Sequence, residues 1–556
     1  MRSLDALEGR KFDVIVVGGG IYGVMAAWEA SLRGITVCLI EKGDFGAETS
    51  SNSLKIIHGG LRYLQHANLV RMRESIRERR YLQQLAPHLI SPVRFSIPIA
   101  GRLKSLAYGC AVRINDWISM DRNAGLPVPR QVPDGKRLNQ REMVERFPWL
   151  DPADCNGGIE WYDCQTYSTE RLLMAFLQAA VRNGVVALNY VKALKLEADG
   201  GLVIGIVAED QAAGQRCSIK SDVVINATGP GSDAFLAESG ISSPEPLFRP
   251  SLAFNVLLNQ QLTTEAVGLS LGETYRDSDA VLGRAGRMYF IVPWRGMTLV
   301  GTKHLPCPKQ PVNGEVDVQL SDAEALIRTI ASTYPRLGIR FETVRHVFRG
   351  LLPETVDINP DGQVQLQKHH AIVDHGKRDG VCGLITVVGV KWTGARGVAE
   401  ELINLVSRKL EKKRTRITKA FVQGGDFHDF ASDSRSLLDH RPSQLPAEIA
   451  AHLVRSRGTD AAQIFAAIEA NPQLAEPIID GSVVCGAEIV SASREFVVHL
   501  EDVLVRRTEA ALLTELDDAS VLRCGKLVAG ALEWSNQKLH AEIDRLQDSH
   551  ERSNAR

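Results

Sequence analysis

The segment FDVIVVGGGIYG, residues 12–23, carries the strongest structural signal in this chain. Its first six residues are mostly apolar and β-branched, which suits a strand that is buried on both faces. Gly18, Gly20 and Gly23 follow at the G-x-G-x-x-G spacing, which permits a tight turn, a close backbone approach to a pyrophosphate and close helix–strand packing. The segment therefore predicts a strand, a phosphate-binding turn and a helix over about residues 21–33.

The residues that follow complete a dinucleotide-binding pattern. Gly34 ends the expected helix, and a second strand at residues 36–40 leads into Glu41 and Lys42. An acidic residue at the end of this strand accepts hydrogen bonds from a ribose 2′-hydroxyl and repels a 2′-phosphate. The N-terminus of the helix offers free N–H groups to the phosphates. Because these parts occur in order, the pattern favours a dinucleotide site over an ordinary strand–turn–helix.

The composition fits a globular protein of two or three domains. The chain has 556 residues, of which 44% are apolar and 24% charged, and its formal net charge of −1 gives no indication of nucleic-acid binding. No apolar run reaches the length of about 18 residues that a spanning helix needs, and the N-terminal segment lacks the apolar core of a signal peptide. The nine cysteines are dispersed, which favours reduced thiols in a cytosolic setting over disulfides or a metal site.

Periodicity predicts the remaining elements. Helices are expected at residues 69–85 with Asn68 as N-cap, at 170–182 and at 395–410. Strands are expected at residues 202–207, 223–226, 252–258, 288–293, 298–301 and 384–390. Residues 91–160 are rich in Pro, Gly and Arg and are expected to be irregular with short strands. The pattern beyond residue 427 is helical.

Several segments together resemble the FAD-dependent glycerol-3-phosphate dehydrogenases, membrane-associated flavoproteins related to D-amino-acid oxidase. These segments are GGGIYG (18–23), TSSNSLKIIHGGLRYL (49–64), NATGP (226–230), GVKWTG (389–394) and LEDVLVRRT (500–508). The string IHGGLRYL is close to diagnostic for that family, and the resemblance covers nearly the full length.

The resemblance implies an α/β flavoprotein with a glutathione-reductase-like, Rossmann-like FAD-binding domain, an antiparallel-sheet substrate domain and an α-helical C-terminal domain. Residues 11–90, 161–235 and 345–410 are expected to form the FAD-binding domain. Residues 91–160 and 236–344 are expected to form the substrate or cap domain. A linker is expected at 411–426, followed by the C-terminal domain at 427–556.

The same resemblance implies which residues hold FAD. Residues 49–55 would follow the pyrophosphate and ribityl chain, residues 58–60 would approach the isoalloxazine ring, and Lys391 would stabilise charge on the reduced flavin. The expected FAD-binding residues are Gly18, Gly20, Gly23, Glu41, Lys42, Thr49, Ser50, Ser51, Ser53, Lys55, His58, Gly60, Ala227, Gly229, Gly389, Lys391 and Thr393.

The expected catalytic residues are His58, Arg62, His304 and Lys391. In the implied reaction a base takes a hydroxyl proton while a hydride passes from carbon to the flavin, which leaves a ketone. His58 and His304 are the candidates for the base, since imidazole titrates near neutral pH, and Arg62 would pair with a phosphate or an alkoxide. The alternatives are that His58 only braces a turn, that Arg62 is a structural ion pair and that His304 is an exposed loop residue.

Three positions depart from the family pattern. The family histidine falls at or near Leu252, the G-T-T-D motif ends here in His304, and the G-V-R-P motif has Leu352 in place of its arginine. Leucine cannot replace a guanidinium that binds an anion through two hydrogen bonds. The FAD-binding residues are therefore largely kept while substrate-facing residues differ, which predicts an altered substrate.

The leading hypothesis is an FAD-dependent dehydrogenase of glycerol metabolism that oxidises glycerol 3-phosphate or a related polyol or sugar phosphate and passes electrons to a quinone or another acceptor. One alternative is an FAD oxidoreductase for an unphosphorylated or larger substrate, and the other is a non-catalytic flavin-binding paralogue. A homodimer and a peripheral membrane contact through the basic segments 71–80 and 409–419 are further expectations. The expected location is the cytoplasm or the inner face of the cytoplasmic membrane.

Overall fold

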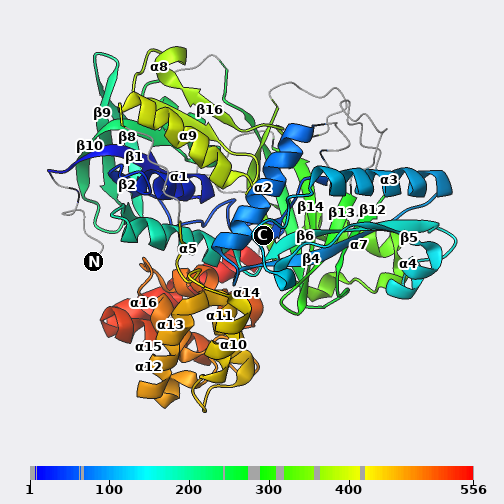
Figure 1. Cartoon of the computed structure of the whole chain (residues 1–556). Helices are drawn as coiled ribbons and strands as arrows, with labels where there is room; N and C mark the ends of the chain where they lie inside the picture. Colours follow the sequence, from blue (N-terminus) through cyan, green and yellow to red (C-terminus); the bar gives the residue numbers. More distant parts are fainter. Residues whose placement is uncertain are drawn as a thin grey trace.

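The chain forms three parts, namely two sheets and a helical C-terminal domain (Figure 1). The computed structural model describes residues 7, 9–61, 63, 68–241, 245–272, 288–307, 318–355, 364–412 and 420–554. Arg62, one of the expected catalytic residues, lies outside these described residues.

The first sheet contains the glycine motif. Its strands lie in the order β16-β17-β10-β1-β2-β7, with β8 and β9 joined to β10, and the strands from β17 to β7 are parallel. Val17, at the end of β1, therefore lies between Asn226 and Ile40, at the ends of β10 and β2. The strands are β1 (Lys11–Val17), β2 (Val37–Ile40), β7 (Val186–Leu188), β8 (Val191–Asp199), β9 (Leu202–Asp210), β10 (Arg216–Asn226), β16 (Ala371–Asp374) and β17 (Leu384–Val388).

Both faces of β1 are buried, as its apolar sequence predicts. Val14 and Val16 pack into a core with the helices that cover one face, whereas Ile15 and Val17 pack into a second core with β8 and β9. The helices beside this sheet are α1 (Ile21–Ser31), α5 (Thr169–Arg182), α6 (Ser232–Glu238), α8 (His375–Arg378) and α9 (Ala395–Lys409). The predicted order of strand, turn, helix and second strand is confirmed.

The second sheet has the order β15-β11-β14-β13-β12-β4-β6-β3, with β5 on β6. Its pairs are antiparallel except for β12 with β4, so the antiparallel sheet expected for the substrate domain is confirmed. Its strands are β3 (Ile56–Ile57), β4 (Ile90–Pro98), β5 (Lys136–Asn139), β6 (Gly157–Thr166), β11 (Arg249–Leu258), β12 (Ala266–Ser270), β13 (Met288–Trp294), β14 (Met297–Pro306) and β15 (Val344–Glu354). The associated helices are α2 (Leu69–Leu85), α3 (Arg102–Ile118), α4 (Gln140–Arg146) and α7 (Leu320–Thr333).

The C-terminal domain is helical and has two apolar cores of its own. Its elements are α10 (Phe430–Asp439), α11 (Ala447–Arg457), α12 (Ala461–Ala470), α13 (Gly486–Ala492), the π-helix η9 (Asp502–Arg507), α14 (Ala510–Leu513), α15 (Asp518–Leu532) and α16 (Asn536–Asn554). Over the described part of the chain, no helix is both long enough and apolar enough to cross a bilayer.

The structure differs from the sequence-based expectations in three places. β6 crosses the expected boundary at residue 161, and β15 belongs to the second sheet because it pairs with β11 along nearly its whole length. The region 91–160, expected to be irregular, contains α3 and α4. In the expected linker, residues 413–419 lie outside the described ranges, but Val422 is buried in the core of the first sheet.

Candidate active site

A cavity of about 590 Å³ lies where β1, β2, β10 and β17 end, and the second sheet forms part of its wall. The carboxyl edge of a parallel sheet is the usual ligand site of such folds. Trp392 and Asn255 line it from the first and second parts. The predicted FAD-binding residues in its lining are Gly18, Gly20, Glu41, Lys42, Thr49, Ser50, Ser53, Ala227, Gly229, Gly389 and Lys391.

The glycine turn has little room for side chains. Gly18 has φ +107°, and a Cβ there would lie 2.5 Å from the carbonyl oxygen of Ala227. A Cβ on Gly23 would overlap the carbonyl oxygen of Gly18, so this glycine allows α1 to pack closely on the turn. At the start of α1, the N–H of Ile21 donates to Ser50 Oγ at 2.9 Å. The N-terminus of α1 therefore faces the cavity.

Glu41 is fixed at the end of β2. Its carboxylate accepts the N–H of Gly19 at 2.6 Å and the N–H of Gly43 at 2.8 Å. Burial raises the pKa of this carboxyl group, although the two hydrogen bonds oppose the shift. The carboxylate thus holds both the glycine turn and the start of the next loop beside the cavity.

Tyr22 connects the glycine motif to residues 389–391, a role that the sequence analysis missed. Its hydroxyl donates to the carbonyl oxygen of Lys391 at 2.7 Å and accepts the N–H groups of Val390 and Lys391, both at 3.1 Å. A Cβ on Gly389 would overlap the Tyr22 ring. Burial raises the pKa of Tyr22 to about 12, which keeps the hydroxyl protonated. The available signal was its position, as an aromatic residue inside the glycine-rich motif GGGIYG.

A second tyrosine, Tyr63, lies beside the cavity in a cluster with His58, Lys391 and Thr393. The Lys391 ammonium contacts the Tyr63 hydroxyl, and its nitrogen lies 4.0 Å from the centroid of that ring. The centroid of the His58 ring lies 6.1 Å from that of the Tyr63 ring, and the backbone N–H of His58 donates to Thr393 Oγ1 at 3.3 Å. The structure thus brings His58, Lys391 and Thr393 together, although only Lys391 lines the cavity.

The His-Gly-Gly segment is held by a buried ion pair. The Gly59 N–H donates to Asp163, and Arg79 Nη1 lies 2.6 Å from the same carboxylate oxygen. A Cβ on Gly59 would overlap the Arg79 guanidinium, and Gly60 has φ +85°. Arg79 is therefore not a surface charge of α2, and its partner could not be identified from local sequence.

Lys55 and Ser51 stabilise the loop from outside the cavity lining. Lys55 Nζ is fully buried and contacts the Glu170 carboxylate at 2.6 and 2.7 Å. The Ser51 hydroxyl donates to the carbonyl oxygen of Gly46. The structure does not place either side chain among the residues that line the cavity.

Strand β11 of the second sheet presents alternate residues, Ala253 and Asn255, to the cavity. Ala253 lines it, whereas Leu252, where the family histidine was expected, packs into an apolar core on the opposite face. His304 pairs with Ala253 across the strands, so the register puts His304 on the cavity face without making it a lining residue. Leu352 does line the cavity, at the position where arginine is expected.

Comparisons with known proteins identify the family. Residues 13–405 match the model described as FAD dependent oxidoreductase, and residues 390–539 match the C-terminal domain of alpha-glycerophosphate oxidase. The probable mitochondrial glycerol-3-phosphate dehydrogenase of Caenorhabditis elegans is 30% identical over 97% of this chain and 73% of its own length. The glycerol-3-phosphate dehydrogenase of Synechocystis is 30% identical over 92% of this chain and 91% of its own. This chain belongs to the FAD-dependent glycerol-3-phosphate dehydrogenase family.

The fold of this family member agrees with a solved structure. The glycerol-3-phosphate dehydrogenase from Bacillus halodurans, complexed with FAD, superposes with a TM-score of 0.74 at 21% identity and covers 98% of this chain and 95% of that chain. This likeness confirms the expected architecture of the flavoprotein, including its helical C-terminal domain.

FAD is the cofactor of this family member, and the cavity fits it. Gly18 and the N-terminus of α1 leave free the space that a pyrophosphate needs, since a Cβ on Gly18 would close the turn. Glu41, at the end of β2, would accept hydrogen bonds from the ribose hydroxyl groups. Lys391, near the end of β17, would lie toward the flavin.

Proposed function

We propose that this protein oxidises glycerol 3-phosphate, or a related polyol or sugar phosphate, to the ketone. The cluster around Tyr63 supports this proposal best, because it contains His58, Lys391 and Thr393. His58 can act as the base, and Lys391 supplies a cation at the FAD cavity. The names of the relatives from Caenorhabditis elegans and Synechocystis point to the same substrate.

In the proposed reaction the substrate hydroxyl loses its proton to His58, or to His304, while the carbinol C–H bond gives up its hydrogen with two electrons. FAD supplies the two-electron acceptor for that hydride. The Lys391 ammonium would stabilise negative charge on the reduced flavin, and Tyr63 orients that ammonium. A quinone-type acceptor then removes the electrons.

Anaerobic titration of the purified protein with glycerol 3-phosphate tests this function. We expect the absorbance of the oxidised flavin to disappear as glycerol 3-phosphate is added. Glycerol at the same concentration should reduce the flavin far more slowly. Flavin that stays oxidised with the phosphate but is reduced by an unphosphorylated polyol would favour the second candidate function below. Flavin that no alcohol reduces would favour the non-catalytic paralogue.

Leu352 favours oxidation of an unphosphorylated substrate as a second candidate function. This side chain lines the cavity with hydrocarbon where a guanidinium was expected. In the same titration, Leu352→Arg should lower the concentration of glycerol 3-phosphate for half-reduction by roughly tenfold or more, because a charge-assisted bidentate contact contributes about 1.5–3 kcal/mol. Leu352→Met, which adds no charge, is the matched control.

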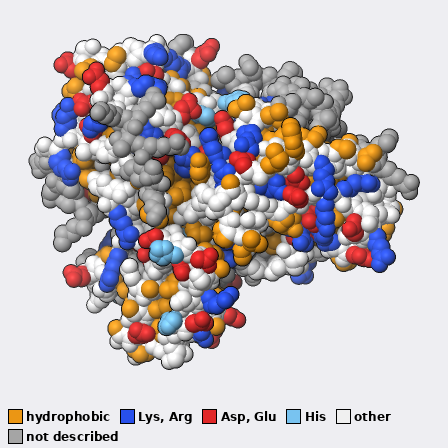
Figure 2. Space-filling model, viewed as in Figure 1, with side chains coloured by type: hydrophobic (Ala, Val, Ile, Leu, Met, Phe, Trp, Pro, Cys, Tyr) orange, Lys and Arg blue, Asp and Glu red, His pale blue; other side chains and the backbone are white. Residues whose placement is uncertain are grey.

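We also propose that α3 makes the peripheral membrane contact. Trp117 in α3 and Met120, just beyond its end, are 70% and 73% exposed, and Leu106, three helical turns before Trp117 on the same face, is exposed as well. In Figure 2 apolar side chains gather with Lys and Arg over the region of α3. An exposed apolar stripe with tryptophan and basic neighbours suits the interface of an anionic bilayer.

The basic segments were the expected membrane contact, but several of their charges have partners within the protein. Arg73 and Arg80 both pair with Asp121, and Lys412 pairs with Asp13 at 2.6 Å. Residues 413–419 of the second segment lie outside the described ranges. The apolar face of α3 therefore supports the contact better than these charges do.

Replacing both Trp117 and Met120 by serine should reduce binding to anionic vesicles at least tenfold, since burying each side chain contributes roughly 1.5–3 kcal/mol. Co-sedimentation with vesicles measures this binding. The control is Leu522→Ser, which removes an exposed leucine from α15 in the C-terminal domain. Equal sedimentation of the double variant and the unchanged protein would rule out α3 as the contact.

A further inference from the structure

The loop of residues 44–55, here called the cofactor loop, is held at both ends by the C-terminal domain. Between its ends, Glu48, Thr49, Ser50, Asn52, Ser53 and Leu54 line the FAD cavity. The end residues Asp44 and Lys55 are buried, and each contacts a residue that lies more than four hundred positions later in the chain.

The first anchor is Asp44 with Arg507. Arg507 Nη2 donates to Asp44 Oδ1 and Nη1 donates to Oδ2, both at 2.7 Å, and Arg506 adds a further contact to Oδ2. Arg507 is itself fully buried, and its Nε donates to the carbonyl oxygen of Glu495 at 2.8 Å. Burial alone would raise the pKa of Asp44, but the two guanidinium groups hold it well below its usual value. This carboxylate is therefore a charged, oriented anchor.

The first anchor reaches the glycine turn through the next residue. The Phe45 ring lies 5.4 Å from the ring of Phe496, which belongs to the C-terminal domain. A Cβ on Gly19 would overlap the Phe45 ring, and the Gly46 N–H donates to the carbonyl oxygen of Gly19 at 3.1 Å. A shift of the C-terminal domain at this point would therefore be transmitted to the phosphate-binding turn by direct packing.

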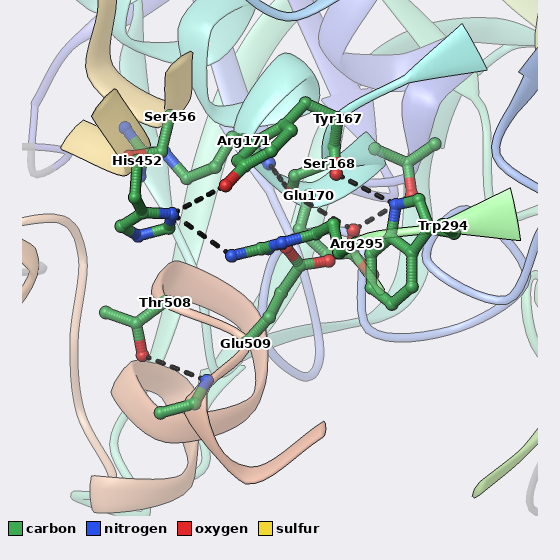
Figure 3. Close-up of polar contacts among 12 residues, drawn as sticks. Tyr167, Ser168, Glu170, Arg171, Trp294, Arg295, His452, Ser456, Thr508 and Glu509 are labelled. Carbon is green, nitrogen blue, oxygen red and sulfur yellow. Dashed lines mark hydrogen bonds and ion pairs between the residues drawn. The ribbon is translucent and has the colours of Figure 1, made fainter. Parts of the chain in front are cut away.

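The second anchor is Lys55 with Glu509. Glu509 Oε1 lies 3.6 Å from Lys55 Nζ, and Glu509 Oε2 accepts a hydrogen bond from Arg295 Nη1 at 2.7 Å. Figure 3 shows Glu170, Arg295 and Glu509 directed toward one another from three parts of the chain. Burial and the Glu170 carboxylate raise the pKa of Glu509 to about 8. The second anchor thus joins α5, the turn between β13 and β14, and the C-terminal domain.

We propose that the C-terminal domain is a positioning element of the FAD site, in which Arg507 and Glu509 fix the two ends of the cofactor loop. The cavity lining that the structure describes ends at Trp392, so the domain acts through Asp44 and Lys55. Loss of an anchor should weaken FAD binding although every residue that would touch FAD stays in place. This gives the family's C-terminal domain a role in holding the cofactor.

The test uses the full-length protein freed of FAD and then titrated with FAD, with quenching of flavin fluorescence as the measure of Kd. Arg507→Met should raise the Kd for FAD at least tenfold, and Glu509→Leu, which removes the carboxyl group that contacts Lys55 and Arg295, should raise it by a smaller factor. Arg523→Met is the matched control, because Arg523 lies in the same domain but pairs with Glu476 at the surface, at 2.7 Å. We expect this control to bind FAD as the unchanged protein does.

Hydrogen exchange separates positioning from a general loss of structure. In Arg507→Met, residues 46–54 should exchange faster while α11 and α15 keep their protection. The double variant Asp44→Asn with Arg507→Met should raise the Kd for FAD no more than the stronger of the two single substitutions does. Faster exchange throughout the C-terminal domain, or an unchanged Kd, would overturn the proposal. If Arg507→Met does not fold, Arg507→Lys keeps the charge without the bidentate contact. An intermediate Kd for that variant supports positioning, and an unchanged Kd overturns it.

Discussion

A Gly18→Ala protein is expected to purify without flavin. The φ of +107° at Gly18 is one that alanine rarely adopts, and the added Cβ would lie 2.5 Å from the carbonyl oxygen of Ala227. Both sides of this contact are backbone, namely the end of β1 and the end of β10, so no side chain can move aside. The turn must open, and the pyrophosphate then loses its close approach to the backbone.

The ratio of flavin to protein absorbance in the purified protein measures this effect. Gly34→Ala is the matched control, because Gly34 also has a positive φ, +69°, but no atom lies within 4 Å of the added Cβ. That substitution should cost about 1–2 kcal/mol of stability and leave the protein yellow. Stoichiometric flavin in a folded Gly18→Ala protein would show that the glycine turn does not hold FAD.

Lys391→Met should slow reduction of the flavin by substrate roughly 100- to 1,000-fold, the usual cost of removing one group that stabilises developing charge. Methionine fills similar space but carries no charge, so FAD should remain bound. Stopped-flow absorbance under anaerobic conditions measures the rate, and the FAD content is checked in the same sample.

Tyr63→Phe provides the comparison for Lys391→Met. It removes the hydroxyl that contacts the Lys391 ammonium but keeps the ring that lies 4.0 Å from it. The rate should therefore fall less than in Lys391→Met. If Lys391→Met reacts within a factor of two of the unchanged protein, its proposed catalytic role is wrong.

The parts of the fold that sequence predicted well are those that local spacing encodes. The β1–α1–β2 unit follows from the glycine spacing, and α2 begins where Asn68 accepts the N–H of Arg71 at 3.1 Å. α3 was missed because its apolar residues lie on two sides of the helix, Val112 in a core and Leu106 and Trp117 at the surface, so no single stripe distinguished the helix within a segment rich in Pro, Gly and Arg.

The remaining features of the site depend on pairings between distant residues. Lys55 was expected beside FAD, but Glu170, 115 residues later, holds its ammonium. Arg79 forms an ion pair with Asp163, 84 positions later. β15 belongs to the second sheet because it pairs with β11. Single charged residues give no sign of such partners, whereas the glycine-rich strings near Gly18 and Gly389 do encode their own close contacts.

The separation of 463 positions between Asp44 and Arg507 also sets an order in time. A ribosome adds roughly 5–20 residues per second, so the beginning of the chain emerges tens of seconds before its partner arginine has been synthesised. Early in that interval β1 and β2 have been synthesised, while Asp44 in the loop beside them does not yet have Arg507 as its partner. If Arg507 fixes the cofactor loop as proposed, we expect each new molecule to bind its vitamin-derived cofactor stably only after the C-terminal domain has been synthesised and has folded against the first sheet.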